Sequence, residues 1–344
     1  MPEINRQWLL ASHPEGMPDE SNWQLVERPV AEPGPGELLV RSLYLSVDPY
    51  MRGRISPARN YTKGVEVGEV MTGGGVGEVL RSNDPRFKPG DVVESFHFGW
   101  QEYPVLRAGD ARRVDPGLGP VHSALSYLGL PGLTAYFTLL HHAPVRAGDT
   151  VVISAAAGAV GQVAGQVAKI AGCRAVAIAS SDEKLAWCRE LGFDAGINYR
   201  TTNDLAASVA EACPGGVDVF LDNTAGPIHD AVMQNLAPKA RVIVCGTVSL
   251  ADRVGRPDVG PRFLRQILVA RARVEGFLLF DYADRYDEGR RRHAAWGKEG
   301  RIRHREDVLD GIERMPRAFL RLLRSENFGK QLVRLAAAEP AAPA

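Results

Sequence analysis

The sequence predicts a two-domain α/β protein in which an irregular β-barrel of short strands precedes a doubly wound parallel sheet. Its 344 residues exceed the size that one hydrophobic core usually serves. Residues 1–125 are rich in Gly and Pro between short alternating segments, and strands alternate with helices over 126–304. We therefore expect one domain over 1–125 with a return segment near 305–338, a second over 126–304, and a disordered tail over 339–344.

In the first domain, short runs with strand-like alternation are separated by turn residues. The turns are the Pro- and Gly-rich stretches 32–36 and 88–91. The expected strands are residues 36–43, 64–72, 77–80 and 91–96. A late helix over 313–323 and a strand over 330–334 are expected to return to this domain.

In the second domain, apolar β-branched runs recur with helical segments between them, which is typical of parallel strands joined by crossovers. Helices over 123–128 and 133–141 introduce this region. The expected strands are residues 151–154, 175–179, 195–198, 217–222, 241–245 and 272–280.

The first of these strands runs directly into a turn of small residues. Residues 150–162 read TVVISAAAGAVGQ, so Ala155, Gly158 and Gly161 follow the strand at the spacing A-x-x-G-x-x-G. Small side chains let the backbone approach a pyrophosphate, which rests on the N-terminus of the following helix. In this context the pattern predicts a Rossmann dinucleotide-binding unit, and a tight turn without a ligand is the alternative.

The end of the next strand indicates which dinucleotide is bound. NAD-preferring units place a carboxylate there for the ribose 2′-hydroxyl. This sequence instead has Ser180 and Ser181, with Lys184 one turn into the next helix and Tyr199 or Arg200 after the third strand. Hydroxyls and a cation suit a 2′-phosphate, so the sequence favours NADPH over NADH. An ordinary helix capped by Ser181, with Lys184 in solvent, is the alternative.

Composition narrows the possible partners and compartments. The chain has 41 basic and 41 acidic residues, which gives no support to a nucleic-acid or anionic-membrane partner. No apolar segment approaches the roughly 18 residues of a membrane helix, and no signal peptide is visible. The four cysteines are scattered without a C-x-x-C pair, as in a reduced, cytoplasmic protein without structural zinc.

Seven stretches along nearly the whole chain resemble one enzyme family and occur in its order. They are residues 46–54 (SVDPYMRGR), 73–79 (GGGVGEV), 130–136 (LPGLTAY), 181–184 (SDEK), 191–194 (LGFD), 222–223 (DN) and 327–330 (NFGK). The chain resembles the medium-chain dehydrogenase/reductase superfamily, and within it the zinc-independent branch of prostaglandin, alkenal and curcumin-type reductases. No cysteine precedes Cys173, so the cysteine ligands of the zinc alcohol dehydrogenases are missing.

The resemblance implies a GroES-like irregular β-barrel catalytic domain and a Rossmann domain that binds NADPH. It implies that the cofactor contacts the turn residues Ala157, Gly158, Ala159, Val160 and Gly161. It also places Lys184 and Tyr199, with Ser180 beside them, at the 2′-phosphate. Further cofactor contacts implied near the nicotinamide ribose and beyond are Asn223, Cys245, Gly246, Thr247 and Asn327.

The resemblance also concerns the substrate and the partner. Tyr50 matches a tyrosine at the mouth of the substrate pocket, to which we also assign His97 and Leu130. A tyrosine that some relatives carry near 263–271 is absent, which leaves Tyr282, Tyr286 or Trp296 as alternatives for shaping the pocket. A homodimer is implied, paired through the sheet edge at 272–280.

Without a metal, reduction of an activated C=C bond is easier than reduction of an unactivated aldehyde. Hydride adds to the β-carbon, and the enolate oxygen needs a hydrogen-bond donor, for which Tyr50 is the first candidate. We expect NADPH-dependent reduction of α,β-unsaturated ketones and aldehydes. A quinone reductase and a catalytically silent NADPH-binding protein are the alternatives. Cys245 is expected to be a buried strand-end residue rather than a reactive thiol, and His141 and His142 to be satisfied rather than metal-bound.

Overall fold

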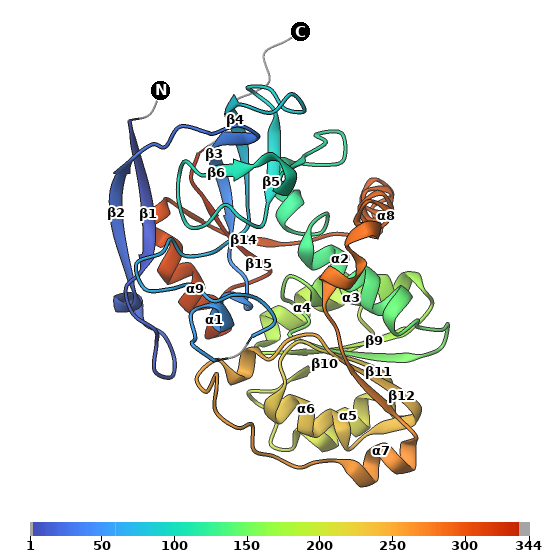
Figure 1. Ribbon diagram of the computed structural model, residues 1–344. Coiled ribbons are helices and arrows are strands. Elements are labelled where there is room, and N and C mark those ends of the chain that lie inside the picture. The colour runs from blue at the N-terminus through green and yellow to red at the C-terminus, as the bar shows by residue number, and fades with distance from the viewer. Residues whose placement is uncertain (1–2, 59, 337–344) are drawn as a thin grey trace. The chain divides into compact units, whose positions relative to one another are not determined.

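The computed structural model describes residues 3–58 and 60–336, which divide into two compact units (Figure 1). The first unit runs to Leu125, includes the short segment Asp252–Arg256 and resumes at Glu306. The second unit consists of Ser126–Ala251 and Pro257–Arg305. The tail predicted over 339–344 lies outside the described residues. Among the described helices, none is both long and apolar enough to span a membrane.

The first unit contains an antiparallel hairpin and a seven-stranded sheet. The hairpin consists of β1 (Ile4–Leu10) and β2 (Trp23–Pro29). The sheet strands are β3 (Glu37–Ser46), β4 (Gly75–Ser82), β5 (Val92–Ser95), β6 (Val105–Arg107), β7 (Arg112–Arg113), β14 (Glu306–Asp310) and β15 (Lys330–Arg334). Their order is β14-β15-β3-β4-β5-β7, with β6 also paired to β3. The helical segments are η1 (Glu20–Asn22), α1 (Met51–Arg54), η2 (Ala108–Asp110), η3 (Val121–Leu125), η7 (Ile312–Arg314) and α9 (Met315–Leu323).

Strand β3 is the centre of this sheet because it is apolar on both faces. Leu38, Leu39 and Val40 are at most 1% exposed. Two glycines of β4 permit close packing: a Cβ at Gly77 would lie 2.4 Å from the Arg41 carbonyl oxygen. Strand β15 pairs antiparallel with β3, so the C-terminal part of the chain completes the sheet that the N-terminal part begins.

The second unit is a six-stranded sheet in which every strand pair is parallel. Its strands are β8 (Thr150–Ser154), β9 (Arg174–Ala179), β10 (Ala195–Asn198), β11 (Val217–Asp222), β12 (Leu236–Val244) and β13 (Arg273–Gly276). Its helical segments are α2 (Leu130–Phe137), η4 (Thr138–His142), α3 (Gly161–Ile170), α4 (Asp182–Glu190), α5 (Leu205–Ala212), α6 (Gly226–Met233), η5 (Val248–Leu250), α7 (Leu264–Ala270), η6 (Leu279–Arg285) and α8 (Tyr286–Lys298).

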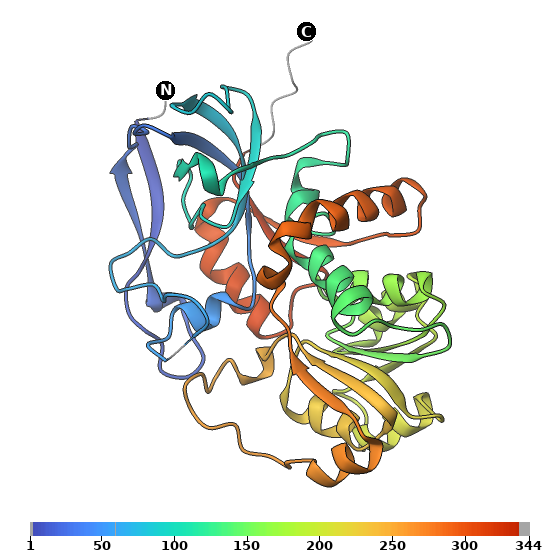
Figure 2. The same cartoon turned by 45° about the vertical axis from the view of Figure 1, so that its right-hand side comes forward.

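The strand order β10-β9-β8-β11-β12-β13 reverses direction between β8 and β11. Helix α3 lies on one face of the sheet, and α5 and α6 lie on the other (Figures 1 and 2). The carboxyl ends of all six strands therefore meet at one edge, and the reversal between β8 and β11 is the point where such sheets bind ligands.

The predicted α/β fold class is confirmed, and four of the six strands predicted for the parallel sheet agree with the observed bounds within one residue. The strand predicted over 241–245 is β12, which begins five residues earlier, at Leu236. The strands predicted over 195–198, 217–222 and 330–334 are β10, β11 and β15. The strand predicted over 272–280 is the shorter β13 (Arg273–Gly276), and the end of the predicted stretch belongs to η6, which begins at Leu279. The helix predicted over 133–141 is α2 continued by the π-helical η4, and the helix predicted over 123–128 is the 3₁₀ segment η3.

The strand predicted over 64–72 is wrong. Among the described residues of that stretch, Val70 alone forms a β-bridge, opposite Leu9. The Glu69 N–H donates to the Glu66 carbonyl at 3.0 Å, and Gly68 adopts a φ of 89°. This glycine-centred turn interrupts the extended chain that the alternating pattern predicts.

Candidate cofactor and active site

The turn after β8 has the tight backbone that its small residues predict. Ala155 adopts a φ of 49°, and the Gly158 N–H donates to the Ala155 carbonyl at 2.8 Å. A Cβ at Gly161 would lie 2.4 Å from the Ala155 oxygen and 2.6 Å from the Ala156 Cα. A Cβ at Gly158 would lie 3.0 Å from the Ala155 oxygen. The turn therefore has no room for a side chain at Gly161, and it brings α3 directly onto the end of β8.

The N-terminus of α3 offers backbone N–H groups to an anion. Within the described chain, the N–H groups of Ala159, Val160 and Gly161 have no backbone acceptor, and Val160 makes no side-chain cap. The ten-residue helix adds positive charge at this end through its dipole. The turn that contains the predicted residues 157–161 therefore fits a pyrophosphate.

The end of β9 places a hydroxyl beside a cation. The Lys184 ammonium donates to Ser180 Oγ at 3.1 Å. Ser181 Oγ caps α4 by accepting from the Lys184 N–H at 3.3 Å, as the alternative interpretation of this segment expects. Tyr199, just after β10, is held at the same strand end because its N–H donates to the Ala179 carbonyl at 3.1 Å. Ser180, Lys184 and Tyr199 together fit a 2′-phosphate.

The residues after β11 and β12 are bonded to one another at the same edge of the sheet. Asn223 donates to Ser154 twice, from Nδ2 to the carbonyl oxygen and from its N–H to Oγ, both at 2.8 Å. The N–H groups of Cys245 and Gly246 donate to the Asp222 carbonyl at 2.8 and 3.1 Å. The predicted residues that the structure brings together at this end are Asn223, Cys245, Gly246 and Thr247.

The cysteine and the two histidines considered as reactive or metal-binding groups are protonated or paired with carboxylates. Cys245 is partly exposed rather than buried as expected, but desolvation raises the pKa of its thiol to about 12 and the charge of Asp222 acts in the same direction, so the thiol stays protonated near neutral pH. His141 lies 3.2 Å from Glu288, and His142 lies 3.4 Å from Glu275. Within the described ranges, no group of three or more His, Cys, Asp or Glu side chains is arranged to hold a metal ion.

In the first unit, Tyr50 stands at the N-terminus of α1, on a loop fixed by a buried ion pair. The Lys330 ammonium contacts Asp48 Oδ1 at 2.6 Å and the Val47 carbonyl at 2.8 Å. Ser46 Oγ donates to the other Asp48 oxygen. Burial raises the pKa of the Tyr50 hydroxyl above its ordinary value, and the charge of Asp48 adds to the shift. Tyr50 therefore keeps its proton and remains a hydrogen-bond donor.

The other predicted residues of the first unit lie on its loops. Asn327 donates from Nδ2 to the Gly329 carbonyl at 2.9 Å, directly before β15. His97 is exposed after β5, with its N–H directed to Ser95 Oγ at 3.2 Å.

Leu130 belongs to the second unit, where it begins α2. A Cβ at Gly132 would lie 1.8 Å from the Tyr127 carbonyl oxygen, so packing requires a glycine in the stretch 130–136. Trp296, an alternative for shaping the pocket, is 2% exposed and packs against Tyr136 in the core.

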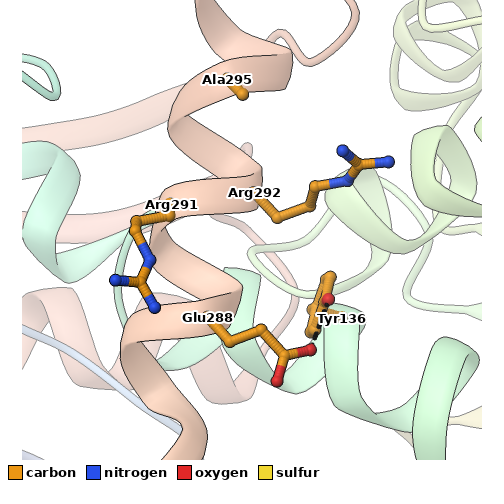
Figure 3. Close-up of a pocket in the computed structure, with 5 residues that line it drawn as sticks. All are labelled: Tyr136, Glu288, Arg291, Arg292 and Ala295. Carbon is orange, nitrogen blue, oxygen red and sulfur yellow. Dashed lines mark hydrogen bonds between the residues drawn. The ribbon is translucent and has the colours of Figure 1, made fainter.

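A depression of about 320 Å³ on α2 and α8 of the second unit contains none of the predicted site residues. Its lining residues are Tyr136, Glu288, Arg291, Arg292 and Ala295. The Tyr136 hydroxyl donates to Glu288 at 2.9 Å, and the guanidinium groups of Arg291 and Arg292 point away from each other (Figure 3). Because the two cations diverge, this depression is not arranged to clamp one anion.

Known proteins resemble this chain over nearly its whole length. Residues 6–114 match the N-terminal domain of oxidoreductases, and residues 159–291 match zinc-binding dehydrogenases. The NADPH-dependent curcumin reductase of Escherichia coli strain K12 is 40% identical over 337 residues, 96% of this chain and 97% of that protein. Prostaglandin reductase 1 of Rattus norvegicus is 36% identical over 338 residues, 96% of this chain and 98% of that protein. The crystal structure of CurA in complex with NADPH from Vibrio vulnificus has a TM-score of 0.91 and 38% identity, covering 96% of this chain and 99% of that one.

The doubly wound sheet with an anion-fitting edge defines the second unit as a nucleotide-binding domain. The chain belongs to the medium-chain dehydrogenase/reductase superfamily, in the zinc-independent branch of NADP-dependent curcumin, prostaglandin and 2-alkenal reductases. The predicted family, enzyme class and NADPH cofactor are confirmed.

Proposed function

We propose that this chain reduces the C=C bond of α,β-unsaturated ketones and aldehydes with NADPH, by hydride transfer to the β-carbon and without a metal. The observation that carries the proposal is Tyr50, a phenolic hydroxyl at the N-terminus of α1, on the loop that the Lys330–Asp48 ion pair holds. Relatives named for curcumin and 2-alkenals support it, because both names denote conjugated carbonyl compounds.

Bound NADPH supplies the hydride, and the chain holds and orients it. The backbone of residues 157–161 would receive the pyrophosphate, and Ser180, Lys184 and Tyr199 would receive the 2′-phosphate. The groups proposed for the nicotinamide end are Asn223, Cys245, Gly246 and Thr247, with Asn327 as a further contact. Contacts of these three residues with the 2′-phosphate would favour NADPH over NADH.

Tyr50 is proposed to donate a hydrogen bond to the carbonyl oxygen, where negative charge develops as hydride reaches the β-carbon. The α-carbon then takes a proton from Tyr50 or from water. Tyr50→Phe is expected to lower kcat/KM by up to about 100-fold. Tyr103→Phe, in the same unit, is the matched control and is expected to leave kcat/KM unchanged. Unchanged kinetics of Tyr50→Phe on several enones would remove Tyr50 from the mechanism.

We also propose a homodimer formed through the edge of the parallel sheet. Strand β13 is the last strand of the sheet, and its edge and the adjoining α7 present apolar side chains. Leu264, Leu268, Val269 and Val274 are 70%, 74%, 66% and 41% exposed. An exposed strand edge with apolar neighbours suits pairing with a second copy of the chain. Sedimentation of the wild type should give a dimer and Leu268→Lys a monomer, whereas a monomeric wild type would contradict the proposal.

We propose a cytoplasmic location for the enzyme. Cys173, Cys188, Cys213 and Cys245 are all unpaired, and the first three are buried. Free thiols are typical of a reducing compartment. Fractionation of the source cells would test this location, and recovery outside the cytoplasm would contradict it.

A panel of acceptors tests the proposed reaction. NADPH oxidation is followed with an enone, an alkenal, a quinone and a saturated aldehyde. We expect turnover with the enone and the alkenal and none with the saturated aldehyde. Turnover with the quinone alone would indicate a quinone reductase, and NADPH binding without oxidation on any acceptor would indicate a catalytically silent protein.

A further inference from the structure

Helix α6 carries a histidine that contacts the last residue of β11. His229 Nδ1 lies 2.8 Å from Asp222 Oδ2, and Asp222 is 0% exposed. The other oxygen of Asp222 accepts from the N–H groups of Thr224 and Ala225 at 3.0 and 2.8 Å. Asp222 therefore joins α6 to the loop 223–226, with one carboxylate oxygen on each.

This loop has a strained backbone. Ala225 adopts φ 60° and ψ −160°, a region that residues with a side chain rarely enter. Such a conformation persists only where surrounding contacts impose it, and the bond from Ala225 to Asp222 is one of them. The same loop includes Asn223, which is bonded to Ser154 at the end of β8. Asn223 therefore belongs to the same short loop whose Thr224 and Ala225 N–H groups are held by Asp222.

The surroundings of His229 are acidic. The charged groups that act on it are Asp222, Asp230 on its own helix and Asp258, and the rings of Phe220 and Phe263 lie beside it. The hydrogen bond to Asp222 is the largest influence that raises the pKa of His229, against the effect of burial. A protonated imidazole gives the buried carboxylate a charge-assisted hydrogen bond, which is roughly twice as strong as a neutral one.

We propose that His229 is a positioning residue for cofactor binding, because it fixes Asp222 and, through Asp222, the loop that presents Asn223 to the nicotinamide ribose. The consequence for NADPH rests on the proposed function. The structural step, in which His229 holds the loop, is independent of any cofactor.

The first test measures amide hydrogen exchange at Thr224 and Ala225 in the full chain without NADPH. His229→Leu removes the donor and is expected to speed exchange about tenfold, and His229→Gln, which retains a neutral donor, is expected to have a smaller effect. His142→Gln is the matched control, because His142 also faces a carboxylate in the same unit. Unchanged exchange in both His229 variants overturns the proposal, and a misfolded His229→Leu leaves His229→Gln to decide.

The second test measures the Kd of NADPH between about pH 6 and pH 9. The wild type should bind more weakly as the pH rises through the pKa of His229. His229→Leu and His229→Gln should lose this part of the pH dependence, and kcat at saturating NADPH should change less than the Kd. Faster exchange with an unchanged Kd and pH profile refutes a role in cofactor positioning. If the wild type binds no NADPH, the proposed function fails, while the exchange result still decides whether His229 holds the loop.

Discussion

The buried ion pair between Lys330 and Asp48 is expected to give a large stability effect when one partner is removed. The two side chains are 1% and 9% exposed, with Nζ and Oδ1 2.6 Å apart. Lys330→Met keeps most of the side-chain length but leaves the Asp48 carboxylate buried without its cation. Removing one partner of a buried pair costs about 3–5 kcal/mol, so a loss of about this size is expected in the free energy of unfolding.

Two further variants show whether burial of charge is the cause. Lys330→Met/Asp48→Leu removes both charges and should recover most of the loss, because apolar replacements of buried pairs are often neutral. Lys169→Met breaks a pair with Asp194 whose side chains are 35% and 30% exposed. This surface control should cost no more than about 1 kcal/mol.

Urea unfolding, followed by tryptophan fluorescence and by circular dichroism, measures these differences. Coincident transitions from the two probes allow a free energy to be extracted. The reasoning is refuted if Lys330→Met loses no more stability than Lys169→Met. It is also refuted if the double variant is less stable than Lys330→Met alone.

Three more predictions follow from contacts in the two units. Gly161→Ala puts a Cβ 2.4 Å from the Ala155 oxygen, so thermal unfolding should show that the free energy of unfolding falls by about 1–3 kcal/mol. Titration with NADPH should show a higher Kd. Wild-type stability and affinity in this variant would contradict the packing argument. Lys184→Met should raise the Kd of NADPH by about 10–100-fold, because one charged hydrogen bond is worth roughly 1.5–3 kcal/mol. The Kd of NADH, which has no 2′-phosphate, should stay unchanged. Equal changes for both cofactors would contradict the assignment of Lys184 to the 2′-phosphate. The hydrogen bond to Glu306 raises the pKa of His122 above 6.5, so its stabilising effect is full below that pH and is lost as the pH rises through the raised pKa. Urea unfolding should therefore show a gap between wild type and His122→Gln that narrows from about pH 5.5 to pH 8.5, and a gap that widens would contradict the sign.

The parallel sheet could be predicted because local pattern and burial agree in it. Val151, Val152 and Ile153 are 0% exposed, as a β-branched run buried on both faces should be. The first unit was less predictable, since its strands pair over long distances and carry mixed patterns. Strand β1, for example, alternates irregularly between buried and partly exposed residues, so its pattern does not predict its pairing with β2.

In the candidate site, too, features set by chain order could be predicted and contacts between distant residues could not. Residues that follow parallel strands could be placed at one edge from chain order alone, and the structure places Ser180, Asn223 and Cys245 there. Contacts between distant side chains left no local signal: Lys330 and Asp48 are 282 positions apart.

Two buried glutamines in the sequence of α3 give a partial indication of one further contact in the second unit, between this helix and the segment 303–305. Gln162 and Gln166 are 1% and 4% exposed among buried residues of α3 that are otherwise apolar or glycine. Their amides bond the backbone of Arg303 and Arg305 at 2.7–3.0 Å, which fixes the segment that leads out of the unit. Two glutamines on a helix face that packs into the core indicate polar partners, but not which partners they are.

The two strained alanines of the second unit clarify how its ligand edge is built. Ala155 follows β8 and Ala225 lies three residues beyond β11, the adjacent strands between which the strand order reverses. Both have positive φ, which costs a residue with a side chain about 1–2 kcal/mol relative to glycine. Ser154 links the two turns, since it bonds both Asp222 and Asn223. The sheet and this hydrogen-bond network therefore impose a costly backbone at the strand ends that would meet the cofactor, which is the pattern expected of a site preorganised for binding rather than for stability.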